Sequence, residues 1–143
     1  QLAGGDQFRV HRDQLLARAH QGNEVYADDY ARALTGSKIG LGFLRNVCPD
    51  QHTTRTFEIP ACGSLLLADR TDEHREFFEE GGEAEFFGSP EELLDKIKFY
   101  CANDDARARI SRAGYERCIS GKYAYVHRME TSLAGVDRAL GLD

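Results

Sequence analysis

The chain has 143 residues, of which 41% are hydrophobic and 29% are charged, and its formal net charge is −6. This length fits one domain with a single hydrophobic core, and the composition is that of an ordinary soluble domain. The acidic excess excludes nonspecific binding to a nucleic-acid backbone, which requires a basic face. No apolar run approaches the roughly 20 residues that cross a bilayer, so we expect no integral membrane segment.

The start of the chain and its cysteines indicate where the protein works. Because the sequence begins with Gln1 rather than Met, we expect residues 1–143 to be one domain of a longer protein. No basic segment followed by an apolar one opens the chain, and we expect a cytoplasmic location. The four cysteines form no CxxC pair and lie at no zinc-finger spacing from a histidine, so we predict neither a metal site nor a disulfide framework.

Three short elements are predicted in the first part of the chain. Residues 11–20 show a loose helical pattern, residues 24–26 favour a short strand, and residues 28–34 favour a short helix. Two aspartates stand at the start of that second helix, where the helix dipole stabilises negative charge.

A buried strand is predicted next, over residues 39–44, because the apolar run IGLGFL is bounded by polar residues. Gly40 and Gly42 lie inside this run and indicate close approach of another backbone or of a ligand. Residues 45–53 contain a proline and no periodicity, so we expect a loop there. A short helix is predicted over residues 54–62, where the following glycine is a favourable stop.

Two more apolar runs, at residues 64–68 and 84–87, predict buried strands separated by a short amphipathic helix at residues 73–80. After the third strand the chain is predicted to be helical. Ser89 is a strong N-cap because proline follows at the first helical position.

Two further helices are expected, one after residue 105 and one from about residue 123 to residue 140. Strands that alternate with helices indicate a parallel sheet covered on both faces. The predicted fold class is therefore α/β, a three-layer Rossmann-like domain.

Ligands of such sheets bind beyond the carboxyl ends of the strands, here near residues 45–55 and 69–76. Thr53 and Thr54 are N-cap candidates for the helix that starts in this region. Arg55 adds a permanent cation to its first turn, where a cation is mildly unfavourable unless an anion binds there.

The segment RTFEIPACGSLLLAD, residues 55–69, resembles the C-terminal domain of the group 1 (GT-B) glycosyltransferases, and most closely the CgeB/YkvP-like spore-maturation glycosyltransferases. Supporting matches are VYADDYARAL before the first strand of the sheet, SPEELLDKIKFY after the third strand, and YAYVHRME near the end. The resemblance spans residues from about 25 to 132. It implies that residues 1–143 are the nucleotide-sugar (donor) domain of a two-domain enzyme that transfers a sugar from a nucleotide-diphosphate sugar.

The resemblance also implies roles for five residues. The superfamily has two acids separated by seven residues, and Asp50 and Glu58 take those positions. Glu58 would hold the ribose hydroxyls of the donor, and Asp50 would face the sugar and diphosphate as a catalytic residue. Thr53, Thr54 and Arg55 are candidates to bind the diphosphate, and Arg55 to stabilise its charge as it departs.

This chain departs from the family pattern at the first acid, which is Asp where Glu is usual, and it has Gln51 and Thr53 where glycines are usual. The resemblance implies no cofactor and no metal, because the substrate itself carries the diphosphate leaving group. The partner it implies is an N-terminal domain of the same chain, which would supply the acceptor side across a cleft. We therefore expect this part alone to be inactive; the acceptor, a glycan, lipid or protein, is not specified.

Simpler interpretations of the site residues stay open on the sequence alone. Glu58 could only complement the helix dipole, and Arg55 could pair with Asp50 or Glu58. His52 is favoured as a solvent-exposed loop residue, and Asp69 as a turn or cap residue, over any role in binding.

Two other functions also stay open. The domain could be a nucleotide-binding or interaction module that has lost turnover. It could also be a phospho-acceptor receiver domain, since Asp28, Asp29, Asp69 and Lys122 mimic the acids and lysine of that class. The receiver reading is disfavoured because its lysine must end a strand, whereas residues 90–140 are predicted to be helical.

Overall fold

The computed structural model describes residues 24–45 and 47–141. Its centre is a parallel three-stranded sheet in the order β1 (Ile39–Gly42), β2 (Leu65–Asp69), β3 (Glu85–Phe87). In the register, Ile39 lies opposite Leu65 and Leu67 lies opposite Glu85. The predicted parallel α/β sheet is confirmed, and all three strands end at the same edge.

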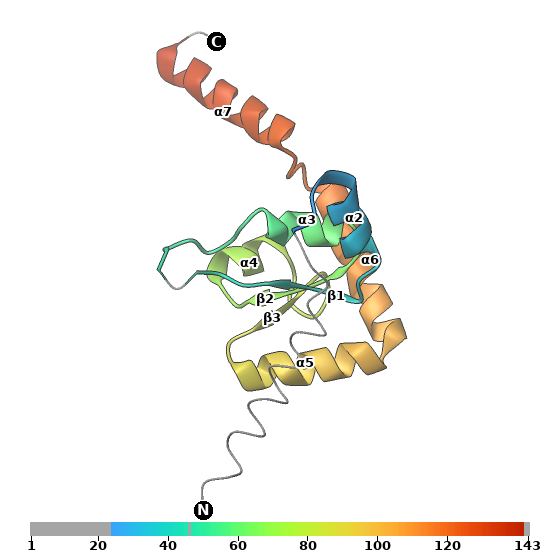
Figure 1. The fold of residues 1–143 in the computed structure, drawn as a ribbon. Coiled ribbons are helices and arrows are strands. Elements are labelled where there is room, and N and C mark those ends of the chain that lie inside the picture. The colour runs from blue at the N-terminus through green and yellow to red at the C-terminus, as the bar shows by residue number, and fades with distance from the viewer. Residues whose placement is uncertain (1–23, 46, 142–143) are drawn as a thin grey trace, which may run out of the picture.

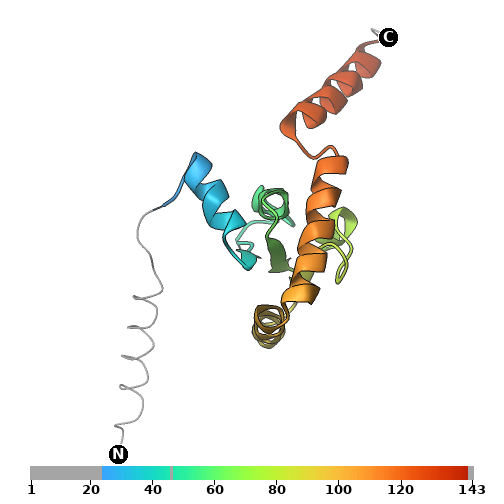
Figure 2. The same cartoon turned by 90° about the vertical axis from the view of Figure 1, so that its right-hand side faces the viewer.

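Helices lie on both sides of this sheet. They are α2 (Ala27–Thr35), α3 (Arg55–Ala61), α4 (Asp72–Phe77), α5 (Pro90–Ala102), α6 (Asp104–Ser120) and α7 (Tyr125–Leu140). In Figure 1, α3 and α4 lie above the sheet and α5 lies below it. Helix α6 runs along the side of these layers, where it contacts α3, α5 and β2 (Figure 2). The three-layer arrangement predicted from the sequence is thus confirmed.

Side chains that alternate along β2 pack against helices on the two faces of the sheet. Leu66 and Ala68 pack with Ile59 of α3 on one face, whereas Leu65 packs with Ile110 of α6 on the other. Burial on both faces is why the strand is an unbroken apolar run rather than an alternating one. The first core also contains the buried side chains of Phe78, Ala84 and Phe86, and the second that of Tyr100.

Two glycines have clear structural reasons. A Cβ atom at Gly40 would lie 2.5 Å from Cγ2 of Ile59, so the close approach predicted for this glycine is to α3. Gly63 follows α3 with φ = 77°, a left-handed conformation that glycine adopts without steric cost, and it ends the helix as predicted.

The strand predicted at residues 24–26 is wrong. Tyr26 is extended, but residues 24–26 pair with no strand in the described part of the chain and lead directly into α2. The side chains of Val25 and Tyr26 are 49% and 71% exposed, so the apolar pattern here reflects surface residues rather than a buried strand. β1 also ends at Gly42 rather than at residue 44, because the N–H of Leu44 donates to the Asp69 carboxylate instead of a neighbouring strand.

Of the helices predicted near the two ends of the chain, only the C-terminal one lies within the described residues. The helix predicted at residues 11–20 lies outside the described residues. The predicted C-terminal helix is present as α7, which projects from the rest of the chain in Figure 1 and buries none of its residues. Within residues 24–45 and 47–141, no helix is both long enough and apolar enough to cross a membrane.

Candidate functional site

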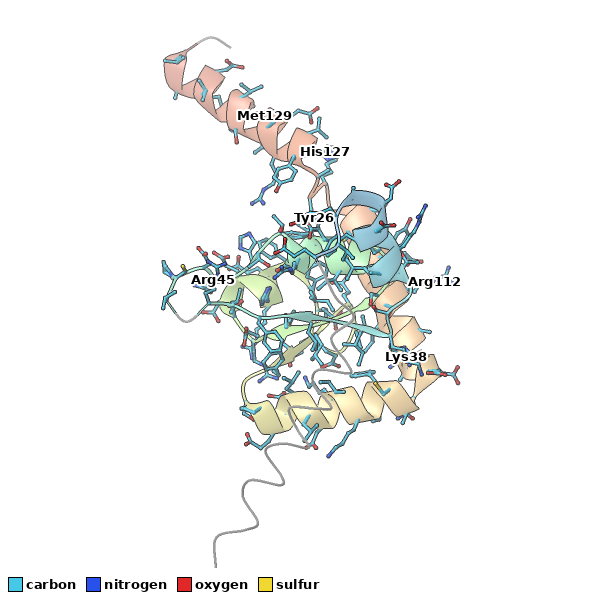
Figure 3. The ribbon with its side chains drawn as sticks, in the orientation of Figure 1. Tyr26, Lys38, Arg45, Arg112, His127 and Met129 are labelled. Carbon is cyan, nitrogen blue, oxygen red and sulfur yellow. The ribbon has the colours of Figure 1, made fainter. Side chains whose placement is uncertain are left out.

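A cavity of about 530 Å³ lies at the carboxyl end of β1. Its walls come from three segments: residues 25–27 and Tyr30 at the start of α2, residues 43–45 with Cys48 and Asp50 after β1, and residues 53–55 with Glu58 at the start of α3. Tyr26 and Arg45, labelled in Figure 3, belong to the first and second of these walls. All five predicted site residues line this one cavity, namely Asp50, Thr53, Thr54, Arg55 and Glu58.

The wall formed by α3 begins with an unexpected set of hydrogen bonds. Thr54 occupies the N-cap position, but its side chain makes no capping hydrogen bond, so the predicted capping by threonine hydroxyls is not found. Instead, Thr56 accepts the N–H of Thr53 on its hydroxyl at 3.2 Å, and its own N–H donates to the carbonyl of Thr53 at 3.1 Å. The hydroxyl of Thr56 thus holds the backbone N–H of Thr53, the residue before the N-cap.

As a result, the cavity gains hydroxyl groups that the helix does not use. The Thr53 and Thr54 side chains form no hydrogen bond with the described residues. Because α3 has only seven residues, its dipole is a small contribution, and the polar side chains set the character of this wall.

The charges in the cavity are largely left without internal partners. Tyr30 of α2 donates its hydroxyl to Oε2 of Glu58 at 3.0 Å, which joins two walls. Burial and the adjacent Glu58 raise the pKa of Tyr30, so the hydroxyl keeps its proton and acts as donor. Within the described residues Arg55 forms no salt bridge with Asp50 or Glu58, so the pairing considered for Arg55 is not found.

Asp69 supports the cavity from behind. Its carboxylate accepts the N–H of Leu44 at 2.6 Å, which fixes the start of the loop that forms the second wall. Its side chain does not line the cavity, and this agrees with the structural role favoured from the sequence.

His52 is placed differently from the prediction. Its side chain is 27% exposed, its ring packs edge-on against Phe57 and Phe77, and its Nδ1 contacts the carboxylate of Glu73. His52 thus lies in the predicted loop, but its predicted solvent exposure is wrong because the side chain is largely covered. His52 lines a second cavity of about 280 Å³ that shares Thr53, Thr54 and Glu58 with the first.

Sequence reasoning missed the contribution of α2. Tyr26 and Tyr30 line the cavity, and Tyr30 holds Glu58, which lies 28 positions later in the chain. No local spacing relates these residues; the available signal is a pair of tyrosines four positions apart, one just before the predicted helix and one within its first turn.

Among the described residues, no group of three or more His, Cys, Asp or Glu side chains is arranged to hold a metal ion. Cys48, which lines the first cavity, is free and exposed. The polar groups that face this cavity are therefore carboxylates, hydroxyls and guanidinium groups.

Comparison with known families places these features in context. The family model described as "Glycosyl transferase-like" matches residues 2–134, which include every strand and all helices from α2 to most of α7. No curated protein and no solved structure matches the chain.

Proposed function

The chain belongs to the glycosyl transferase-like family, and from that membership we propose that its 530 Å³ cavity binds the nucleotide-diphosphate sugar of a glycosyl transfer reaction. The observation that carries the proposal is the convergence of Asp50, Thr53, Thr54, Arg55 and Glu58 on one cavity. The cavity lies beyond the carboxyl end of a parallel strand, the usual ligand position in such sheets. Its volume is within the usual range for small-molecule sites.

Glu58 is assigned to the ribose. A carboxylate accepts hydrogen bonds from two neighbouring hydroxyls, and the hydroxyl of Tyr30 at 3.0 Å holds one of its oxygens in place. That bond joins α2 to α3 across the cavity, so the ribose would be bound where two walls meet.

The diphosphate is assigned to Arg55 with Thr53 and Thr54. A guanidinium group binds phosphate oxygens in pairs, and Arg55 has no salt bridge within the described residues to compete with a ligand. The two threonine hydroxyls add short, neutral donors beside it. Together these groups would bind a doubly charged diphosphate without a metal ion.

The same groups would lower the barrier for transfer. When the bond between the sugar and the diphosphate breaks, negative charge develops on the departing oxygen. Fixed donors and a cation aimed at that charge stabilise the transition state more than the ground state, and this is often the largest catalytic contribution. Asp50, on the loop between β1 and α3, is assigned to the sugar end of the donor.

The acceptor is assigned to a second domain that precedes this one in the GT-B arrangement, with the CgeB/YkvP-like proteins as the nearest subgroup. Closure of two domains over the donor would exclude water from the transferred sugar. This domain alone would therefore bind the donor without transferring its sugar.

Calorimetric titration with UDP, GDP, ADP, TDP and their common sugars tests the proposal. We expect one nucleotide series to bind, and Glu58→Ala to weaken it about ten-fold or more, as expected for loss of charge-assisted hydrogen bonds. Glu91→Ala is the matched control, since Glu91 is an exposed acid in the first turn of α5, far from the cavity in sequence. Equal affinity of the folded Glu58 variant and wild type would overturn the ribose assignment.

A non-catalytic binding module is the second candidate, and the departures at Asp50, Gln51 and Thr53 from the family pattern favour it. The cavity and its donor ligand would be the same in both cases. Donor binding by the longer protein, without sugar transfer to any glycan, lipid or protein acceptor, would support this second candidate.

A further inference from the structure

His74 of α4 is the most buried ionisable side chain near the cavity, with 1% of its surface exposed. Its ring stacks on that of Phe86 in β3, with centroids 5.4 Å apart and an angle of 8° between the planes. Burying an imidazole is costly unless both ring nitrogens find partners, so its hydrogen bonds define its role.

Those hydrogen bonds fix its protonation. Nδ1 lies 2.7 Å from the carbonyl oxygen of Asp69, which can only accept, so Nδ1 carries the proton. Nε2 of the neutral ring is then an acceptor, and the Thr56 hydroxyl, 2.9 Å away, donates to it. His74 therefore links the end of β2 to α3 as a neutral ring of one tautomer.

The link continues to the cavity wall. The same Thr56 hydroxyl accepts the N–H of Thr53 at 3.2 Å, and Thr53 lines the cavity. Asp69 is the anchor for two walls, because its carbonyl holds His74 and its carboxylate holds the N–H of Leu44 at 2.6 Å. The turn that presents Thr53, Thr54 and Arg55 is thus fixed from behind by a continuous set of hydrogen bonds.

We propose that His74 is a positioning residue whose neutral ring holds the Thr53–Thr56 turn in place for the donor diphosphate, and that protonation of the ring releases the turn. The inference rests on the proposed function, since it concerns the same cavity. Its consequence is that donor binding weakens in acid, as the ring of His74 gains its second proton.

Protonation conflicts with the observed contacts in two ways. A proton on Nε2 would point at Thr56, reverse that hydrogen bond, and leave the Thr56 hydroxyl without an acceptor among the described residues. It would also bury a charge. The charged and titratable groups that face the ring are His52 in the loop before α3, Asp69 at the end of β2 and Glu73 in α4.

Burial is the largest influence and lowers the pKa of His74 below its usual value of 6.5, against the backbone hydrogen bond to Asp69, which raises it. For a base whose pKa is lower in the folded than in the unfolded state, the native state keeps its full stability at pH values above the unfolded pKa. The native state is then penalised progressively as the pH falls below about 6.5.

The test compares Thr56→Val, which keeps the shape but removes the hydroxyl, with Thr56→Ser, which keeps the hydroxyl. Nucleotide sugars are suitable probes because their diphosphate does not titrate between pH 5 and 8; we would use UDP-glucose, GDP-mannose, ADP-glucose and TDP-glucose. We expect wild type and Thr56→Ser to lose affinity as the pH falls from 7.5 through the lowered pKa of His74, by about five-fold once the ring is protonated, the equivalent of one ordinary hydrogen bond. Thr56→Val should bind about five-fold more weakly at pH 7.5 and show little further change with pH. His52→Gln should keep the wild-type profile, which separates the two histidines.

A ligand-free measurement keeps the inference testable even if no probe binds. Nitrogen-15 NMR of the histidine rings should show the Nδ1–H tautomer for His74. The amide signals of Thr53 and Thr54 should follow the titration of His74 in wild type and not in Thr56→Val. The inference would be overturned if the amide signals of Thr53 and Thr54 in wild type do not follow the titration of His74. It would also be overturned if the pH profile of binding is the same in Thr56→Val and wild type. If the amide signals follow the titration of His74 as expected but no nucleotide sugar binds, the proposed function alone would be rejected.

Discussion

Beside β1, the charged side chains of the cavity have few internal partners, whereas beside β3 the charged side chains are fully paired with one another. Arg70 donates to Glu80 at 2.6 Å and to Glu92 at 2.9 Å, and Lys96 donates to Glu85 at 2.6 Å. Lys96 also lies 3.3 Å from both Glu80 and Glu92, and Arg75 lies 3.7 Å from Glu80, so three acids share three cations. Arg55 and Glu58 at the cavity show no such pairing with the described residues.

The difference separates charges that serve the fold from charges that are available to a ligand. Arg70 lowers the pKa of Glu92 to about 2, and the side chain of Glu85, only 7% exposed, is bound by both Lys96 and the hydroxyl of Tyr100. Such groups are already satisfied and gain little from an added anion or cation. We therefore expect substitutions beside β3 to change stability, and substitutions at the cavity to change binding.

The largest expected effect is on stability, in Lys96→Met. This change removes the cation from the buried Glu85 carboxylate and should lower the free energy of unfolding by about 2 kcal/mol, because a buried charge loses its partner. Urea denaturation measures the loss. Lys98→Met is the matched control, since Lys98 is exposed on the same helix, and nucleotide-sugar affinity should change in neither variant. A loss of affinity in Lys96→Met without a loss of stability would break the comparison.

The next effect is on binding, in Arg55→Ala. Loss of the guanidinium should weaken nucleotide-sugar affinity about ten-fold or more, as for a hydrogen-bonded charge pair, and change stability by no more than about 0.5 kcal/mol. Arg112→Ala is the control, because Arg112 is exposed at the opposite edge of the sheet, near Lys38 in Figure 3. Calorimetry and urea denaturation together check both parts. A destabilised Arg55 variant with normal affinity would assign Arg55 to the fold.

A smaller effect is expected on the acid limit of stability. The pKa values of Glu80 and Glu92 are lowered, chiefly by hydrogen bonds from Arg70, and that of Glu92 falls to about 2. For an acid whose folded pKa is depressed, the stabilisation is present above the unfolded value of about 4.5 and is lost as the pH falls toward 2. Urea midpoints between pH 5 and 2 should fall less steeply in Glu92→Gln than in wild type. Equal slopes would show that the ion pairs are screened by solvent.

Both regions show what the sequence could and could not predict. The buried strands follow from apolar runs, and the rule that ligands bind beyond their carboxyl ends indicates the region of the cavity. The resemblance adds Asp50 and Glu58, which line that cavity with Thr53, Thr54 and Arg55, and the roles of all five stay predictions. Arg70 and Glu92 lie 22 positions apart and meet only because β2 and β3 are neighbours. No periodicity reports such a contact.

The predicted roles of single polar residues failed for a related reason. His52 lies in the predicted loop, but it is partly buried because its ring packs on Phe77, a residue of α4 that no local spacing relates to the loop. The positions of Thr53 and Thr54 are typical of caps, but neither hydroxyl caps α3; the hydroxyl of Thr56, which contacts His74, instead accepts the N–H of Thr53. Hydrogen bonds between distant segments decide these roles, and sequence spacing does not determine them.

The smallest expected effect belongs to Tyr30→Phe, and it tests whether the cavity has any internal organisation of its own. The change removes only the hydroxyl that donates to Glu58 at 3.0 Å and keeps the ring in the cavity wall. Because this bond lies at an exposed site, its loss should weaken nucleotide-sugar affinity by about two- to five-fold, with no measurable change in stability. Tyr115→Phe is the control, since Tyr115 is an exposed tyrosine on α6 outside the cavity.

Combining Tyr30→Phe with Glu58→Ala sharpens the measurement, because the losses of affinity should not be additive when two residues act through one hydrogen bond. Full additivity would mean that Tyr30 contacts the donor directly and does not act by positioning Glu58.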